Sequence, residues 1–346
     1  MSPALPIDLR SDTVTRPTAA MREDMARAEV GDDQYSEDPT TNRLQVEMAA
    51  LLGKEAALWL PSGTMANQVA VMTLARPGDE VITAREAHAG WHEVGAAAAN
   101  AGVQIVEVGS GGVFTREMFD AAIKPAGLPV FPTTTVVEIE NTHNRAGGVV
   151  FPQDEVVRIC TLARERGIAS FLDGARLWNA AVASGRSEAD LAAPFDLVSV
   201  AFSKGLGAPG GSLLAGPRDL IQRANRHRRR LGGAMRQVGI FAAAALHGVT
   251  HHRARLAEDH ANARWLATRL AACAAVNLDL ATVQTNIVVF HLLPGAPDAA
   301  SVVARAREVG VLVAAFGPRT VRAVTHLDVS AQQCSDAAER LLQALR

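Results

Sequence analysis

The stretch VSVAFSKGLGAPGGS, which runs from Val198 to Ser212, joins an apolar run to a lysine and a glycine-rich turn. Its apolar part, residues 197–202, has the length and the valine content of a buried strand. The lysine, Lys204, is one of only three in a chain with 34 basic residues. A solvated loop lysine is the ordinary explanation. A lysine held against an apolar sheet would instead have a lowered pKa and a nucleophilic amine.

Strand-like runs and helical stretches alternate on the N-terminal side of this stretch. Two helices come first, one opened by Pro17 and one over residues 39–52. The alternation then predicts strands over 56–60, 80–84, 103–108, 136–139, 168–172 and 197–202, separated by helices from Thr64, across 91–101, over 153–166 and over 176–184. Strands that alternate with helices favour a mostly parallel sheet that is covered on both faces.

The C-terminal part of the chain has a different pattern. Residues 234–270 are rich in alanine and predict one long, almost uninterrupted helix. After Ala275, strand-like runs over 286–292, 311–316 and 320–324 lie among helical stretches near 300–309 and 331–345. We therefore predict an N-terminal arm over 1–16, a large domain over 17–249 and a small α/β domain over 250–346.

Composition and charge argue against several classes of protein. A formal net charge of −2 provides no basic surface for nucleic acid or for an anionic membrane. The apolar stretches are too short to cross a bilayer. Three isolated cysteines and an N-terminus without the pattern of a signal peptide indicate a reducing, cytoplasmic environment.

Two groups of basic side chains have an ordinary explanation. The run RANRHRRR, residues 223–230, has no aromatic residues among its charges, so we interpret it as a helix face with phosphate contacts. His251, His252 and His260 match no common zinc spacing, and we interpret them as a solvated helix face. We therefore expect no metal site.

Three predicted strands end in polar residues that a single ligand could use. The strand 56–60 ends in PSGT, residues 61–64, which could bind a phosphate or simply cap the next helix. The strand 168–172 ends in Asp173, an acid that needs a helix cap, a metal or a cationic ring nitrogen. The strand 197–202 ends beside Lys204. Ligands lie beyond the carboxyl ends of strands in an open α/β sheet, so these groups are expected to converge.

An anion site, an acid and a lysine at one sheet edge are the groups that pyridoxal phosphate requires. Its phosphate needs an anchor, its ring nitrogen needs a carboxylate, and its aldehyde carbon forms a Schiff base with a lysine. This hypothesis explains why position 204 holds a lysine in a chain that otherwise uses arginine.

The chain resembles the low-specificity L-threonine aldolases, which are pyridoxal phosphate enzymes of the aspartate-aminotransferase-like class (fold type I) and of the β-eliminating lyase superfamily. The likeness covers nearly the whole chain. It rests on eight ordered motifs, which are DLRSDTVTRP (8–17), VGDDQYSEDPTTNRL (30–44), PSGTMANQ (61–68), IENTHNRAGG (139–148), LDGARLWNAAV (172–182), SKGLGAPGGS (203–212), LGGAMRQ (231–237) and VRAVTHLDVS (321–330).

The resemblance implies an architecture, a reaction and an assembly. The large domain would hold a seven-stranded, mostly parallel sheet flanked by helices, beside a small C-terminal α/β domain. The reaction would be retro-aldol cleavage of an L-β-hydroxy-α-amino acid, of the L-threonine or L-allo-threonine type, to glycine and an aldehyde. The enzyme would be a homotetramer with sites shared between subunits. β-Elimination, racemisation or transamination on the same cofactor is the alternative.

The resemblance also implies a role for each matched position. Lys204 would carry the cofactor, Asp173 would pair with the ring nitrogen, and His88 would stack on the ring. His143 would lie near the substrate hydroxyl, and either histidine, or a water between them, is the candidate base. The remaining roles are Ser62, Gly63 and Thr64 at the phosphate, Ser11, Arg176 and Arg322 at the substrate carboxylate, and Tyr35 and Arg229 at the site of a neighbouring subunit.

Some positions depart from the family pattern or have a plainer explanation. Arg229 stands where the family more often has lysine. Trp91 and His92 form an unusual pair after His88 and, with Gln34, could lie near the pocket for the substrate side chain. For Arg176, the alternative to carboxylate binding is a structural salt bridge with a nearby acid.

Overall fold

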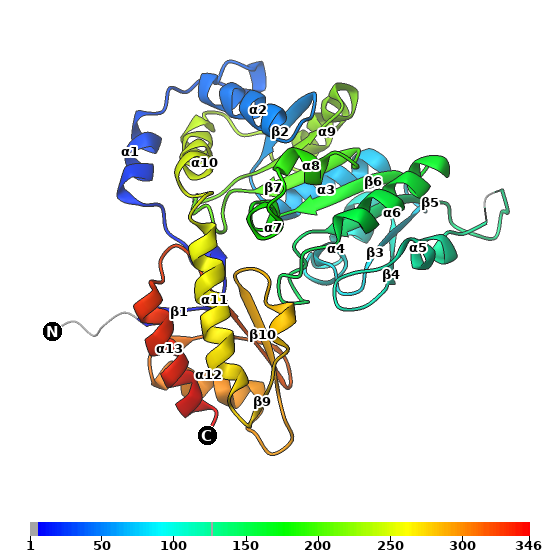
Figure 1. Cartoon of the computed structure of the whole chain (residues 1–346). Coiled ribbons are helices and arrows are strands. Elements are labelled where there is room, and N and C mark those ends of the chain that lie inside the picture. Colours follow the sequence, from blue (N-terminus) through cyan, green and yellow to red (C-terminus); the bar gives the residue numbers. More distant parts are fainter. Residues whose placement is uncertain (1–5, 126) are drawn as a thin grey trace.

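The structure is a computed structural model that describes residues 6–125 and 127–346. Its larger sheet is built from β2 (Ala56–Leu60), β3 (Glu80–Ala84), β4 (Gln104–Val108), β5 (Thr134–Glu140), β6 (Ala169–Gly174), β7 (Leu197–Ala201) and β8 (Ser212–Gly216). The strand order is β2-β8-β7-β6-β5-β3-β4 (Figure 1). The strands from β7 to β4 are parallel, and β8 runs antiparallel to both of its neighbours. The predicted α/β fold with a mostly parallel, seven-stranded sheet is confirmed.

Helices cover both faces of this sheet (Figure 1). They are α1 (Ala19–Arg27), α2 (Pro39–Leu51), α3 (Gly63–Leu74), α4 (His88–Trp91), α5 (Arg116–Ala122), α6 (Gln153–Glu165), α7 (Leu177–Ser184), α8 (Glu188–Ala192), α9 (Arg218–Arg230) and α10 (Gly239–His251), with the short helical turns η1 (Asp12–Val14), η2 (Asp33–Tyr35) and η3 (Ala97–Ala101). Val69 of α3 and Phe171 of β6 belong to the apolar cluster of one face. Ile159 of α6 and Leu172 of β6 belong to that of the other face.

A second, antiparallel sheet forms a separate core. Its elements are α11 (Leu256–Ala271), β9 (Val276–Asn277), η4 (Leu280–Thr282), β10 (Ile287–Leu292), α12 (Ala299–Glu308), β11 (Val311–Leu312), β12 (Ala314–Gly317), β13 (Thr320–Val324) and α13 (Ala331–Ala344). The sheet order is β12-β13-β10-β9, and Leu266, Phe290 and Leu341 belong to its apolar cluster. No helix within residues 6–125 or 127–346 is long and apolar enough to cross a membrane.

The N-terminal arm is attached to the second core. Strand β1 (Ile7–Asp8) pairs in parallel with β11, and Ile7 and Leu9 are buried in the same apolar cluster. The chain then crosses to the large sheet through η1. α10 ends at His251 and α11 begins at Leu256. The division of the chain at residues 16 and 249 stays a prediction.

Two predicted helices are interrupted in the structure. The helix expected over 91–101 is broken because Val94 and Gly95 have positive φ angles of 56° and 71°, which a right-handed helix does not allow. The helix expected over 234–270 begins only at Gly239 and is divided by a turn over residues 252–255. Neither prediction is correct as a single helix.

The turn after α10 also changes the interpretation of its histidines. His252 is buried, and its Nδ1 lies 2.8 Å from the carbonyl oxygen of Leu206. His260 lies with its Nε2 3.1 Å from the Asn179 amide, and burial lowers the pKa of His260 to about 4. Only His251 is exposed. The prediction of a solvated face is therefore wrong for His252 and His260.

Trp178 of α7 is the side chain whose truncation should reduce stability most clearly. It is 2% exposed, stacks on Phe202 with ring centres 6.3 Å apart, and donates its indole N–H to the Ala201 oxygen at 2.9 Å. We expect Trp178→Ala to lower the free energy of unfolding by about 3–5 kcal/mol. Urea unfolding measures this, and Trp265→Ala is the matched control because Trp265 is 41% exposed. Equal losses in both variants would contradict the prediction.

Candidate active site

The strand ends bring most of the predicted residues to one edge of the large sheet. His88 follows β3, His143 follows β5, Asp173 lies at the end of β6, and Lys204 follows β7. β2 also ends at this edge, before Ser62, because the antiparallel β8 lies between β2 and β7. The expected convergence at the carboxyl edge of an open sheet is therefore present.

Lys204 lies in a setting that makes its amine reactive. Burial, together with the positive charge of Arg176, lowers the pKa of Lys204 to about 8. More of this amine is neutral near physiological pH than for an exposed lysine. The glycines after it have a steric reason, since a Cβ at Gly205 would lie 2.7 Å from a Leu256 methyl carbon and Gly207 has a φ of +77°.

Asp173 is a buried carboxylate that ion-pairs with no described side chain. Its Oδ2 accepts a hydrogen bond of 2.7 Å from the Asn67 amide, and its Oδ1 accepts one of 3.0 Å from the Ala175 backbone N–H. Burial and the nearby Glu140 carboxylate raise the pKa of Asp173. A cation close to this carboxylate would offset both effects, as a protonated ring nitrogen would.

His88 is oriented by a carboxylate. Its Nδ1 lies 2.9 Å from Glu93 Oε1, so in the neutral ring Nδ1 carries the proton and Nε2 keeps its lone pair. Glu93 also accepts a hydrogen bond of 2.9 Å from Asn67, which links it to Asp173. Burial lowers the pKa of His88, but the Glu93 hydrogen bond and the Asp173 charge outweigh burial, and the pKa is raised.

His143 is held in the opposite tautomer. It is buried, and its Nδ1 accepts a hydrogen bond of 3.2 Å from the Ala146 backbone N–H. The proton of the neutral ring is therefore on Nε2, which lies 3.7 Å from Glu140 and has no hydrogen-bond partner among the described residues. In its neutral form, His143 offers a donor at this nitrogen rather than a base.

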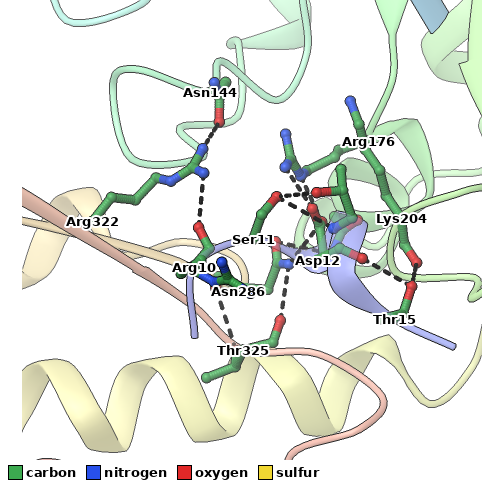
Figure 2. Close-up of polar contacts among 12 residues, drawn as sticks. Arg10, Ser11, Asp12, Thr15, Asn144, Arg176, Lys204, Asn286, Arg322 and Thr325 are labelled. Atoms are coloured by element: carbon green, nitrogen blue, oxygen red, sulfur yellow. Dashed lines mark hydrogen bonds and ion pairs between the residues drawn. The ribbon is translucent and has the colours of Figure 1, made fainter. Parts of the chain in front are cut away.

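Arg176 is tied to an acid of the N-terminal arm. Its Nε donates a hydrogen bond of 2.7 Å to Asp12 Oδ2, and its Nη2 donates one of 2.7 Å to Asp12 Oδ1 (Figure 2). The salt bridge given above as the alternative is therefore present. The pair leaves Nη1 without a described acceptor, so a role in carboxylate binding stays a prediction.

Arg322 is a buried cation that ion-pairs with no acid of the described chain. Its Nη1 donates to the Asn144 side-chain oxygen at 2.7 Å and its Nη2 to the Arg10 carbonyl at 2.8 Å, while its Nε has no described partner (Figure 2). Burial and the charge of Arg176 lower the pKa of Arg322 to about 10. A bound carboxylate would supply the missing counter-charge.

The start of α3 is open enough to receive an anion. Ser62 caps the helix by accepting the Met65 N–H at 3.2 Å, which is the plainer of the two predicted uses of its hydroxyl. A Cβ at Gly63 would meet nothing within 4 Å, and Thr64 is exposed. Ser11 is half-buried at the other side of the site, where its oxygen accepts the Thr13 hydroxyl at 2.9 Å.

Tyr35 and Arg229 are not brought to Lys204 in this chain. Tyr35 ends η2 and is two-thirds exposed. Arg229 is exposed in a surface cavity that Gln34 also lines. Among the described contacts, none connects these side chains to Lys204 or Asp173. Their predicted role at the site of a neighbouring subunit stays a prediction.

A cavity of about 700 Å3 opens beside His143. The guanidinium carbon of Arg145 lies 4.8 Å from the Trp91 ring centre and 5.1 Å from that of Phe316. Phe316 also receives the Arg322 guanidinium at 4.1 Å. These cation–π contacts hold Arg145, Trp91 and Phe316 together at the side of the cavity. Trp91 therefore lines a cavity beside His143, and the place of Trp91, His92 and Gln34 near the pocket for the substrate side chain stays a prediction.

Several polar residues of this edge are not predicted from the sequence. Glu93 has the clearest signal, because it follows His88 by five residues in a short polar segment. Asp12 lies inside a family motif, but its partner is distant in the chain. Asn67 and Glu140 have no local signal. Across residues 6–125 and 127–346, no three His, Cys, Asp or Glu side chains are arranged to hold a metal ion, and the absence of a metal stays a prediction.

Glu138 of β5 is a further buried acid near this edge. Neither of its carboxyl oxygens has a hydrogen-bond partner in the described chain. Burial and the negative charges of Asp173, Glu93 and Glu140 raise the pKa of Glu138 well above its ordinary value. The carboxyl group is therefore protonated in the folded protein over a pH range in which it ionises in the unfolded chain.

Glu138 should make stability depend on pH. The folded state binds a proton that the unfolded state has lost above about pH 4.5, so the unfolding free energy falls by up to ~1.4 kcal/mol per pH unit as pH rises. We expect the stability of Glu138→Gln relative to the wild type to increase between pH 6 and pH 8. Urea unfolding at each pH tests this, with the exposed Glu47→Gln as control. A difference that does not change with pH would refute the prediction.

Comparison with known proteins agrees with this geometry. Residues 8–292 match the β-eliminating lyase family. The chain is 42% identical to the low-specificity L-threonine aldolase of Escherichia coli K12, over 96% of this chain and 97% of that one. It is 38% identical to low-specificity L-threonine aldolase 1 of Arabidopsis thaliana, over 94% and 92% of the two chains. The solved threonine aldolase of Leishmania major has the same fold, with a TM-score of 0.83 at 20% identity, over 99% of this chain and 100% of that one. The chain thus belongs to the β-eliminating lyase family, in its low-specificity L-threonine aldolase group.

Proposed function

We propose that this protein is a pyridoxal phosphate-dependent aldolase that cleaves L-β-hydroxy-α-amino acids to glycine and an aldehyde. One observation carries the proposal: Arg322, in β13 of the second sheet, is a buried guanidinium that ion-pairs with no described acid, and it lies within range of the charge of Arg176, which also acts on the reactive amine of Lys204. An amino acid substrate brings the carboxylate that Arg322 lacks. The family relationship supports the same reaction.

The residues present fit the cofactor. Asp173 is a buried carboxylate without a cation, which suits a protonated ring nitrogen. The open N-terminus of α3, at Gly63 and Thr64, suits a phosphate. Lys204 supplies the amine that would hold the cofactor covalently. When bound, pyridoxal phosphate supplies an electron-withdrawing ring that accepts the electrons of the broken Cα–Cβ bond.

The two histidines suit different tasks. In neutral His88 the hydrogen bond to Glu93 keeps the proton on Nδ1 and leaves a lone pair on Nε2. We therefore assign the removal of the β-hydroxyl proton to His88. His143 presents an N–H instead and suits a hydrogen bond to a substrate oxygen. Arg176, Arg322 and the hydroxyl of Ser11 hold the substrate carboxylate. This grip selects the Cα bond that breaks.

The test is to incubate the cofactor-loaded protein with L-threonine, L-allo-threonine and L-phenylserine and to measure glycine and aldehyde together. Equimolar release of both products is the expected result. A protein that binds the cofactor but yields pyruvate, a keto acid or the other enantiomer carries out one of the alternative reactions. A protein that takes up no cofactor refutes the proposal.

Assembly and location belong to the same proposal. We infer a homotetramer in which Tyr35 and Arg229 reach a neighbouring site, which the exposed apolar side chains Val30, Tyr35 and Ile240 support. The free thiols of Cys160, Cys273 and Cys334 support a reducing, cytoplasmic setting. Light scattering coupled to size-exclusion chromatography measures the mass, and a monomer at micromolar concentration would contradict the shared sites.

A further inference from the structure

Asp12 is an acid of the site whose two carboxylate oxygens are both hydrogen-bonded, although it lies in the N-terminal arm. It is fully buried in η1, and each of its carboxylate oxygens accepts a hydrogen bond of 2.7 Å from Arg176 (Figure 2). This is a bidentate pair, which fixes the plane of the guanidinium as well as its position. The orientation of Arg176 is therefore set by Asp12.

The same carboxylate is tied to the second sheet. The Asn286 amide, just before β10, donates to Asp12 Oδ2 at 3.2 Å and to the Thr325 oxygen, just after β13, at 3.1 Å (Figure 2). Asp12 is thus bonded to both sheets, with Arg176 on the side of the large one. If one sheet moves against the other, Asp12 has to lose its hydrogen bonds either to Arg176 or to Asn286.

The arm also reaches the lysine segment. The Thr15 hydroxyl lies 2.9 Å from the Asp12 carbonyl oxygen and 3.0 Å from the Lys204 carbonyl oxygen (Figure 2). The negative charges of Asp12, Asp173 and Glu140 raise the pKa of Lys204 and so oppose the effect of the positive charge of Arg176. Asp12 is therefore coupled to both Arg176 and Lys204.

Stability alone is a weak reason for this pair. A buried ion pair contributes little net stability, because desolvation of the two charges offsets their attraction. Apolar side chains of similar volume would hold the arm equally well. The ion pair adds two properties that apolar packing lacks, namely a fixed direction for the guanidinium and a negative charge beside the lysine.

We propose that Asp12 is a positioning residue for the reaction, which fixes Arg176 so that its free Nη1 meets the substrate carboxylate and which balances the charge of Arg176 beside Lys204. The proposal rests on the aldolase function proposed above. Asp12 itself acts through Arg176 and makes no bond to substrate. A guanidinium fixed in advance loses less conformational entropy when the substrate binds.

The first test is Asp12→Asn, which keeps the size of the side chain but removes its charge. We expect the KM for L-threonine to rise at least ~10-fold, with a smaller change in kcat, because a misplaced carboxylate contact weakens binding before it affects chemistry. In the full-length protein freed of cofactor, labelling of Lys204 by trinitrobenzenesulfonate should show its midpoint about one pH unit below the wild-type value. A purely structural role would leave this midpoint unchanged.

Two further variants separate charge from geometry. Asp12→Glu keeps the charge but displaces it by one methylene, so the labelling midpoint should return to the wild-type value while KM stays raised. Asp8→Asn is the matched control, because Asp8 lies in the same arm and, among the described residues, ion-pairs with Arg10 alone, near the surface. We expect Asp8→Asn to change neither KM nor the midpoint.

The outcomes distinguish this proposal from the function on which it rests. If Asp12→Asn leaves both KM and the midpoint unchanged, Asp12 is structural and the proposal is overturned. If the wild type itself forms no glycine, the aldolase function fails, and the labelling midpoint still decides whether Asp12 balances the charge. If Asp12→Asn does not fold, Asn286→Ala replaces it: a raised KM with an unchanged midpoint supports the proposal, and an unchanged KM overturns it.

Discussion

We expect the Lys204→Ala protein to lose at least ~10³-fold in kcat/KM for L-threonine, since it has no amine at the place where the cofactor would be held. The physical reason is the setting of Lys204, whose pKa is lowered to about 8 by burial and by Arg176. Burial also lowers the pKa of Lys54, but neither of the other two lysines lies at the carboxyl edge of the large sheet, since Lys54 precedes β2 and Lys124 follows α5. Lys54 donates to the Phe195 carbonyl oxygen at 2.6 Å, and Lys124 lies 3.9 Å from Glu80.

The measurement combines turnover with chemical trapping. Borohydride reduction in the presence of pyridoxal phosphate should attach one cofactor per wild-type chain, at Lys204, as mass spectrometry of the peptides would show. Lys124→Ala is the control and should retain both the label and the activity. Stoichiometric labelling of Lys54 or Lys124 in place of Lys204 would overturn the assignment of the cofactor lysine.

The second large effect is expected at Asp173. Asp173→Asn keeps the size of the side chain but replaces the negative charge by an amide, so a cationic ring nitrogen would lose its counter-charge. We expect kcat/KM to fall by at least ~10²-fold, as when a group that stabilises developing charge is removed. Measurement at saturating cofactor separates this loss from weaker cofactor binding.

The control for Asp173 comes from the opposite edge of the same sheet. Asp196 precedes β7 and accepts the Ser170 backbone N–H at 2.7 Å and the Ser170 hydroxyl at 2.9 Å. Asp196→Asn removes a comparable charge far from the carboxyl ends of the strands. We expect a loss of stability without a loss of kcat/KM. Equal losses of activity in both variants would mean that Asp173 acts through the fold and not through the cofactor.

The parts of the fold that could be predicted are those with a local cause. β2 and β3 have the predicted bounds, because a short apolar run bounded by turn formers has only one way to be buried. The first residue of α2 follows from Asp38 and Pro39, which cap and open a helix without help from the rest of the chain.

The interrupted helices show where local reasoning ends. Alanine favours a helix throughout residues 234–270, and the turn after His251 has neither glycine nor proline to signal it. Leu246 before the turn and Leu256 after it both belong to the core of the large sheet, and α11 then enters the core of the second sheet at Leu266, so the turn lets this part of the chain pack against both cores. Tertiary packing decides this position, and no short window of sequence contains that information.

The residues of the site also fall into those that the sequence predicts and those that only the structure reveals. Lys204 and Asp173 could be found because each ends a predicted strand, and strand ends of a parallel sheet meet. Arg322 lies within β13 of the second sheet, and its lack of an acid partner is visible only in three dimensions. The pairing of Arg176 with Asp12 joins residues 164 positions apart, so the sequence alone left both of its interpretations open.

The pairing of β1 with β11 has a consequence for how the protein is made. Strand β1 is synthesised long before its partner, because Ile7 pairs with Val311. Asp12 likewise cannot form its hydrogen bonds until Arg176 and Asn286 have been synthesised. The large sheet can form during synthesis, since its strands end at Gly216. The site therefore closes only after Val311 and Arg322 have been synthesised, and a nascent chain cut before Val311 should have a sheet but no closed site.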